Sequence, residues 1–250
     1  MTTVSSPREP ELSGQTVVVI GGSSGIGLET ARRAVREGAD VIITGRKADK
    51  LKQAAADTGA RDVAVFDVTD PAALEGFFGD LPGPIDHVLV TGPGPYYAPL
   101  AELDRERARA DFDHHVWLAV AVTQQAVGRV RPGGTLLFMA GTGGRSRGAG
   151  NSLIAAGTAA LPALIANLAV EAAPIRVNLM AAGFVDTPLS ASLLGDNLEA
   201  RRAQLRATLP IRRVVGPADI AALAVHIMAN TALTGGTYDI DGGQQLVPGA

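Results

Sequence analysis

Residues 16–27 have the sequence TVVVIGGSSGIG, in which a β-branched run leads directly into closely spaced glycines. The run at 16–20 predicts a buried strand, and the alanine-rich residues 26–36 predict a helix. Glycines between a strand and a helix let the backbone turn tightly and approach a phosphate at the positively polarised helix N-terminus. The stretch therefore predicts a dinucleotide-binding loop. The alternative is a glycine-rich turn that binds no ligand.

Short strand-like and helix-like segments alternate along the rest of the chain. Further strands are expected at residues 41–44, 63–66, 87–90, 135–139, 175–179 and 237–240, and helices at 48–56, 71–78, 103–130, 153–171 and 218–228. Alternation at this spacing indicates right-handed crossovers between parallel strands. The expected fold class is α/β, a Rossmann-type doubly wound parallel sheet of about seven strands with helices on both faces.

The chain is expected to form one domain. Residues 1–11 are polar and contain two prolines, which is typical of a flexible N-terminal tail, and residues 12–250 are long enough for one sizeable core. Residues 187–210 interrupt the alternation. They are polar and helix-prone, and too long for a connector, so we expect a lid over the cleft.

The composition excludes several kinds of site. The chain has 250 residues, 46% of them hydrophobic, a formal net charge of −3 and no cysteine. Disulfides, thiolate zinc sites and cysteine nucleophiles are therefore excluded, and no metal site is expected. The absence of lysine or arginine runs argues against nucleic acid as a partner. With neither a signal-like N-terminus nor an apolar run of about 18 residues, we expect a cytoplasmic protein without membrane contact.

Arg46 occupies the position that reads the adenosine ribose in a dinucleotide fold, about twenty residues beyond the glycine loop. An acidic residue there accepts hydrogen bonds from a free 2′-hydroxyl, whereas a guanidinium binds a 2′-phosphate. The sequence therefore favours NADP(H) over NAD(H). The alternative is a solvated arginine at the end of a strand.

Residues 12–246 resemble the short-chain dehydrogenase/reductase family. The glycine loop is similar to that family's Thr-Gly-x-x-x-Gly-x-Gly, with Ile20 in the threonine's place, and residues 238–243 are similar to its last strand and Asp-Gly-Gly turn. The sequence TGPG at 91–94 departs from the family's Asn-Asn-Ala-Gly. The resemblance implies a nicotinamide-dependent enzyme. It also implies a homodimer or homotetramer, because family members often associate through the helices corresponding to residues 103–130 and 153–171.

The resemblance also extends the set of expected cofactor contacts. Asp67 and Val68 are similar to the pair that contacts adenine, and residues 182–187 resemble the Pro-Gly-x-x-x-Thr segment that holds the nicotinamide amide. With the glycine loop and Arg46, the full expected set is Gly21, Ser23, Ser24, Gly25, Ile26, Gly27, Arg46, Asp67, Val68, Thr91, Gly92, Gly183, Val185 and Thr187.

The family's catalytic residues are missing from this sequence. Aligned on the alanines at 159–160, the family's serine, tyrosine and lysine correspond to Gly141, Ile154 and Thr158, and its asparagine corresponds to His115. In the family, the tyrosine donates a proton to the substrate, the serine binds the substrate oxygen, and the lysine lowers the tyrosine's pKa. The three lysines lie at positions 47, 50 and 52 and the three tyrosines at 96, 97 and 238, so no shift of the alignment restores the pair.

Two side chains are candidates for a replacement acid. Tyr97, with Tyr96, follows the expected fourth strand at the edge where such folds bind ligands, and Arg145 or Arg147 could supply a cation that lowers its pKa. The alternative is that both rings pack over the pocket mouth. His115 titrates in the right range, and the alternative for it is a satisfied core histidine.

Three functions remain open. The first is an NADPH-dependent oxidoreductase that acts on a small, apolar carbonyl or unsaturated compound with a non-standard acid. The second is an NADP(H)-binding sensor or pseudo-enzyme without chemistry. The third is a cyclase or isomerase in which the cofactor is passive. A hydrophobic segment at 153–166 favours an apolar substrate in both catalytic cases.

Overall fold

The computed structural model describes residues 11–145 and 148–247, which form one seven-stranded sheet in the order β3-β2-β1-β4-β5-β6-β7. Every adjacent pair of strands is parallel. The strands are β1 (Thr16–Ile20), β2 (Asp40–Gly45), β3 (Asp62–Val65), β4 (Ile85–Val90), β5 (Val130–Gly141), β6 (Arg176–Ala182) and β7 (Thr237–Ile240). The expected Rossmann-type α/β fold is confirmed.

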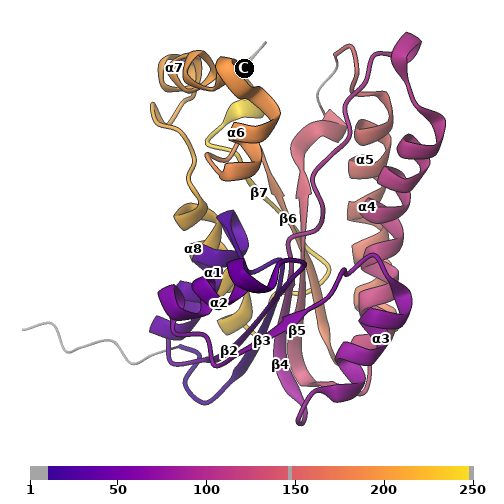
Figure 1. Cartoon of the computed structure of the whole chain (residues 1–250), viewed down its shortest axis with the longest axis vertical. Helices are drawn as coiled ribbons and strands as arrows, with labels where there is room; N and C mark the ends of the chain where they lie inside the picture. The colour runs from indigo at the N-terminus through magenta and orange to yellow at the C-terminus, as the bar shows by residue number, and fades with distance from the viewer. Residues whose placement is uncertain (1–10, 146–147, 248–250) are drawn as a thin grey trace, which may run out of the picture.

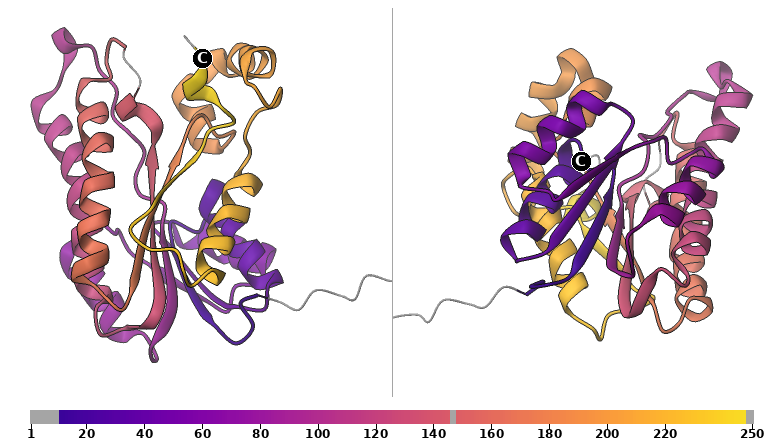
Figure 2. Two further views of the ribbon diagram at one scale, coloured as in Figure 1. Left: turned by 180° about the vertical axis from the view of Figure 1, so that it is seen from behind. Right: turned by 60° about the horizontal axis from the view of Figure 1, so that its bottom comes forward.

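Helices cover both faces of the sheet, as Figures 1 and 2 show. One face carries α1 (Gly25–Arg36), α2 (Ala48–Thr58) and α8 (Pro217–Ala229), and the other carries α3 (Pro71–Asp80), α4 (Arg105–Ala126) and α5 (Ser152–Glu171). Two further helices, α6 (Pro188–Leu194) and α7 (Leu198–Thr208), lie beyond one end of the strands. Short 3₁₀ turns are η1 (Leu100–Glu102), η2 (Thr142–Arg145), η3 (Gly195–Asn197) and η4 (Gln244–Leu246).

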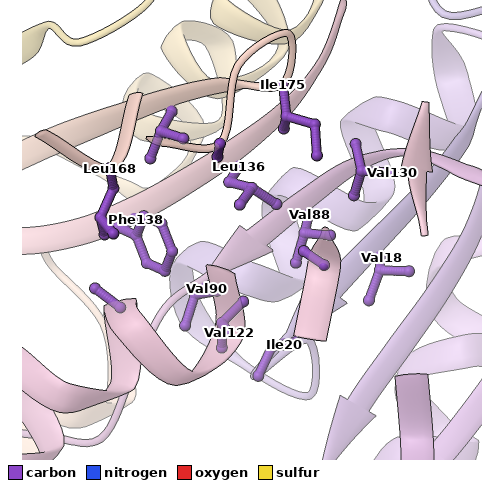
Figure 3. Close-up of a cluster of buried hydrophobic side chains, with 14 of the residues drawn as sticks. Val18, Ile20, Val88, Val90, Val122, Val130, Leu136, Phe138, Leu168 and Ile175 are labelled. Carbon is purple, nitrogen blue, oxygen red and sulfur yellow. The ribbon is translucent and has the colours of Figure 1, made fainter. Parts of the chain in front are cut away.

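The two cores follow from the alternation of side chains along each strand. Val18, Val88 and Leu136 point to one face, where they pack against Val122 of α4 and Leu168 of α5 (Figure 3). The intervening strand residues point to the other face, against α1, α2 and α8. Because both faces are covered, the central strands are almost continuously apolar, which is why they could be identified from the sequence.

Two expected boundaries were wrong. The helix expected at 103–130 ends at Ala126, because Gly128 adopts a φ of +82° and turns the chain, and Val130 already pairs with Ile85 as the first residue of β5. The strand expected at 135–139 is therefore longer, and its register with β4 shifts between Ile85 and His87. The segment 187–210 contains α6, η3 and α7.

The expectation that no apolar run reaches about 18 residues was wrong for α5, which is long and apolar enough to cross a membrane by length and composition alone. No other helix in the described part of the chain is. In the fold it packs against α4 and β6, with Ile154, Leu161, Ile165 and Leu168 buried. A core helix of an α/β domain accounts for the same composition.

Candidate cofactor and active site

The glycine loop lies where the strand order reverses, between β1 and β4. A Cβ on Gly21 would be 2.1 Å from Thr91 Oγ1, and the φ of Gly21 is +89°. The Thr91 hydroxyl donates to the carbonyl of Ile20 at 3.0 Å. Gly92 follows with a φ of +67°. The carboxyl ends of β1 and β4 are thus in contact at the switch point, the point where the strand order reverses, which is where open α/β sheets bind ligands.

The first turn of α1 rests on this loop. A Cβ on Gly27 would be 2.3 Å from the carbonyl oxygen of Gly21, so only glycine fits. Ser24 is the N-cap residue, but its side chain makes no capping hydrogen bond, and the first turn carries no acidic residue. The N-terminal amides at 25–27 therefore lack a capping side chain, and this arrangement fits a phosphate group. Ile26 packs against the α1 face core, and Ser23 lies beside Gly45 at the end of β2.

Arg46 and Asp67 lie at the neighbouring strand ends, and Arg46 is exposed. The pKa of Asp67 is lowered, chiefly by the backbone amide of Thr69, then by the Thr69 hydroxyl, and further by the positive charges of Arg46 and His114. The side chains of Arg46, Asp67 and His114 are therefore close enough to interact electrostatically. Val68 packs against the core on the α4 side.

The segment after β6 crosses in front of the glycine loop. Thr187 Cβ would be 3.5 Å from a Cβ on Gly25, and Leu189 of α6 would be 2.8 Å from a Cβ on Gly94. The Thr187 hydroxyl caps α6 by accepting the amide of Ser190 at 3.2 Å. Three stretches distant in the sequence, at 21–27, 91–94 and 183–189, thus come together at one edge of the sheet.

Gln244 and Val215 also contact this segment, at residues 183–185. A Cβ on Gly183 would be 2.6 Å from Gln244 Oε1, which accepts the amide of Phe184 at 2.8 Å. Val185 is buried and forms an isolated bridge with Val215. No sequence pattern selects Gln244, because its contact with Phe184 depends on where the chain passes after β7.

The positions expected for the family's serine, tyrosine and lysine carry no free proton donor. Ile154 and Thr158 are buried in α5, and the Thr158 hydroxyl donates to the carbonyl of Ile154 at 2.7 Å. The turn η2 packs directly on this helix, since a Cβ on Gly144 would be 2.8 Å from the backbone nitrogen of Ala159. A cavity of about 180 Å³ remains between η2, α5 and strands β5, β6 and β7, lined in part by Gly141 and Thr158.

His115 lies beside these positions, on α4. A Cβ on Gly157 of α5 would be 3.9 Å from His115 Cβ. The His115 Nδ1 is 2.8 Å from the carbonyl oxygen of Asp111, and 14% of the side chain is exposed. In the described part of the chain Nε2 has no hydrogen-bond partner. A carbonyl can only accept, so Nδ1 carries the proton and Nε2 presents the lone pair.

The two adjacent tyrosines have different environments. Tyr96 is anchored: its amide donates to Asp111, its hydroxyl accepts the amide of Asp104 at 3.2 Å, and its ring lies under Arg107. Tyr97 is 51% exposed, yet its pKa is raised, first by desolvation of the hydroxyl and then by the negative charge of Asp111.

Arg145, one of the two arginines considered as a cation for Tyr97, has other partners. Arg145 instead forms a bidentate pair with Asp239 and donates to Gln245 at 2.7 Å, which raises the arginine's pKa. Arg147 lies outside the described residues. The raised pKa of Tyr97 is opposite to the shift that a role as an acid would need.

Asp111 is the site residue that the sequence reasoning missed. Its spacing of four residues before His115 was a readable signal, since side chains four apart share a helical face. The described residues contain no group of three or more metal-ligating side chains.

Comparisons with known proteins identify the family. Residues 20–245 match a family model described as enoyl-(acyl carrier protein) reductase. A short-chain dehydrogenase/reductase of Stachybotrys chlorohalonatus is 28% identical, with 95% of this chain and 99% of that protein covered. An uncharacterized oxidoreductase of Mycobacterium tuberculosis is 32% identical, with 93% and 92% covered.

Solved structures agree with this assignment. The MalC reductase/Diels-Alderase of Malbranchea aurantiaca has a TM-score of 0.88 and 25% identity, covering 95% of this chain and 99% of that one. BdcA, solved in complex with NADPH, has a TM-score of 0.82 and 26% identity, covering 93% and 95%. The fold, the glycine loop and these similarities together show that the chain belongs to the short-chain dehydrogenase/reductase family.

Proposed function

We propose that the protein is an NADP(H)-dependent oxidoreductase that acts on a small, apolar carbonyl or unsaturated compound, with His115 as its proton-handling group. The observation that carries the proposal is the placement of an oriented imidazole beside Gly157 of α5, next to the positions where the family's tyrosine and lysine are expected. A histidine there can exchange a proton near neutral pH, whereas Ile154 and Gly141 cannot.

The residues at the switch point fit NADP(H). The tight glycine loop and the uncapped N-terminus of α1 suit the pyrophosphate, and the exposed Arg46 suits a 2′-phosphate. Asp67 and Val68 would lie at the adenine, and the segment 183–187 at the nicotinamide. A similar solved structure contains NADPH. The cofactor would supply the hydride, and the protein supplies binding, orientation and proton transfer.

His115 would act through Nε2, because Nδ1 is already bound to the helix backbone. Tyr97 is the second candidate donor. Its raised pKa keeps it protonated at neutral pH but makes it a weaker acid than an ordinary phenol. Apolar side chains around the expected substrate position, including Ile154 and Leu189, favour a substrate with little charge.

A second candidate is a non-redox cyclase or isomerase on the same scaffold. It is favoured because Ile154 is buried and apolar and the Thr158 hydroxyl already donates to the carbonyl of Ile154. The positions of the family's tyrosine and lysine therefore offer no proton donor. The similar MalC structure is described as both a reductase and a Diels-Alderase. A sensor that binds NADP(H) without chemistry is compatible with the same two residues.

Oxidation of NADPH at 340 nm, measured with a panel of small apolar ketones, diketones and enones, separates these functions. We expect turnover with at least one compound. His115→Gln should lower kcat at least about tenfold, since a general acid contributes about 10²- to 10⁴-fold. NADPH affinity, measured by fluorescence, should stay within about twofold. His226→Gln, an exposed histidine on α8, is the matched control.

The outcomes discriminate clearly. NADPH binding without turnover of any compound favours the non-redox functions. Turnover that His115→Gln leaves unchanged assigns proton transfer to Tyr97 or to solvent, and Tyr97→Phe then distinguishes the two.

We further infer a homodimer or homotetramer formed through α4 and α5. Exposed apolar side chains occur on or directly after both helices, namely Trp117 (62%), Val127 (55%) and Val170 (77%), and such side chains are available for a subunit interface. Light scattering should give a mass at least twice that of the chain, and Trp117→Glu should reduce it. A cytoplasmic location, without nucleic acid or membrane as partner, completes the proposal, and cell fractionation tests it.

A further inference from the structure

Asp111 is a buried carboxylate that contacts two parts of the candidate site at once. Its Oδ1 accepts the backbone amide of Tyr96 at 2.9 Å and lies 3.6 Å from His115 Nδ1. Only 8% of the residue is exposed. We infer that Asp111 is a positioning residue that couples the basicity of His115 to the placement of the Tyr96–Tyr97 loop. The catalytic part of this inference rests on the proposed function, but its structural part does not.

The histidine side of the coupling is electrostatic. At 3.6 Å the carboxylate is too distant from Nδ1 for a hydrogen bond, and the backbone carbonyl of the same residue already accepts from Nδ1 at 2.8 Å. The helix backbone thus sets the tautomer of His115, independently of the Asp111 side chain. The carboxylate contributes a negative charge close to the ring, and a negative charge at this distance favours the charged form of a basic group.

The loop side of the coupling is a hydrogen bond. The amide of Tyr96 reaches across fifteen residues of sequence to Asp111, while the Tyr96 ring and hydroxyl are fixed against Arg107 and Asp104 near the start of α4. Tyr97 is the next residue, so its position over the site depends on the same anchor. The negative charge of Asp111 also contributes to the raised pKa of Tyr97.

Other charged groups near His115 do not duplicate Asp111. In the described part of the chain, Asp111 is the only carboxylate within 4.0 Å of the imidazole. Asp113 on the same helix pairs with Arg109 at 3.9 Å. On α5, the packed residues Ile154, Gly157 and Thr158 carry no charge, and the 91–99 loop contributes only the two tyrosines as titratable groups. Of the neighbouring cations, His114 acts on Asp67 and Arg107 lies over Tyr96.

Two substitutions separate charge from hydrogen bonding. Asp111→Asn removes the charge but keeps an amide oxygen for the Tyr96 amide, whereas Asp111→Ala removes both. The chain has four histidines, so their imidazole signals can be assigned and titrated individually by NMR. Asp113→Asn removes the same charge two residues further along α4, where the side chain is 46% exposed and pairs with Arg109, and serves as the control.

We expect Asp111→Asn to lower the pKa of His115 by about one unit without changing its tautomer, and to leave hydrogen exchange of the Tyr96 amide within about threefold. Asp111→Ala should lower the pKa equally and also accelerate that exchange at least about tenfold. In an active preparation that reduces a carbonyl, Asn should shift the alkaline limb of the kcat–pH profile to lower pH with little change in KM, because His115 must be protonated to donate. Ala should in addition raise KM.

An unchanged His115 pKa in Asp111→Asn overturns the inference, as does a Tyr96 amide that remains equally protected in Asp111→Ala. If the alanine variant does not fold, the asparagine variant still decides the electrostatic half, and Tyr96→Gly then tests the loop half through the mobility of Tyr97. Because these readouts need no substrate, their failure is distinct from failure of the proposed function, which His115→Gln decides separately.

Discussion

Gly144 and Ala159 approach so closely that no side chain fits between them: a Cβ on Gly144 would lie 2.8 Å from the Ala159 backbone nitrogen and 3.0 Å from its Cα. The contact presses η2 onto α5 at the level of Thr158. Thr158, at the position expected for the family's lysine, is the residue before Ala159, and it lines the adjoining cavity of about 180 Å³ together with Gly141 and Gly144. The contact between η2 and α5 therefore forms one wall of that cavity.

Gly144→Ala should destabilise the protein by about 1–3 kcal/mol, because the atoms in the way belong to the helix backbone and cannot rotate aside. Gly141→Ala is the matched control, since the nearest atoms to its Cβ are 3.8 and 3.9 Å away. Urea denaturation of the two variants provides the measurement. Equal stabilities would show that η2 does not rest on α5 in solution.

The pH dependence of stability should contain a contribution from His87. Burial, and secondly the charge of Arg176, lower the pKa of His87 from 6.5 to about 3. Below pH 6.5 the unfolded chain therefore binds a proton at His87 that the folded chain does not bind. The contribution of His87 to the free energy of unfolding is fully present above pH 6.5 and is lost as the pH falls towards 3. At pH 5 the loss is about 2 kcal/mol.

His87→Leu should flatten the stability profile between pH 7 and pH 5 by about that amount, although its stability at pH 7 should be lower because the contact with Gln15 is lost. His226→Gln changes an exposed histidine and should leave the slope unchanged. The comparison uses the difference between variant and parent, so shared carboxylate contributions cancel. A parallel pair of profiles for His87→Leu and the parent would contradict the prediction.

The order of strands and helices could be read from the sequence because the sheet is buried on both faces. Each strand is then a short run such as 17–20, bounded by glycine or charged residues, and each helix has an apolar side. The end of α4 could not be read, since the pairing of Val130 with Ile85 is a long-range contact that overrides the local helical pattern.

Part of the candidate site could likewise be predicted from the sequence, and part could not. The spacing of the glycines predicts the cofactor-binding loop. The four-residue spacing of Asp111 and His115 indicates that these two residues share a helix face and can interact. The bond from the Tyr96 amide to Asp111 depends on the path of the 91–104 segment, which has no periodic pattern. The pKa of Tyr97, raised by desolvation and then by the charge of Asp111, depends on that path, which residue types alone do not give.

Arg176 should be among the most important residues for stability. It is 5% exposed and donates to the carbonyls of Ile227 and Met228, in the last turn of α8, at 2.8 and 2.7 Å. It also donates to the carbonyls of Gly133, Asn230 and Leu233. A cation at a helix C-terminus satisfies carbonyls that have no partner within the helix.

Arg176→Met removes all of these donors and leaves buried carbonyls unpaired, so the free energy of unfolding should fall by more than about 3 kcal/mol. Arg176→Lys keeps the charge and part of the bonding, and should lie between Met and the parent. Urea denaturation at pH 7 measures both. A methionine variant within about 1 kcal/mol of the parent would show that water replaces the guanidinium at these carbonyls.

Arg46 should determine the choice between NADPH and NADH. It is exposed directly after β2, where a guanidinium can bind a 2′-phosphate without the cost of desolvating a buried charge. One charge-assisted hydrogen-bond partner contributes about 1.5–3 kcal/mol, hence about 10- to 100-fold in affinity. Arg46→Asp should erase or reverse a preference for NADPH measured by fluorescence titration. Arg36→Asp makes the same charge change at the far end of α1 and should preserve it. Equal affinities of the parent for NADPH and NADH would refute the assignment, because the exposed guanidinium would then contribute nothing that distinguishes the two cofactors.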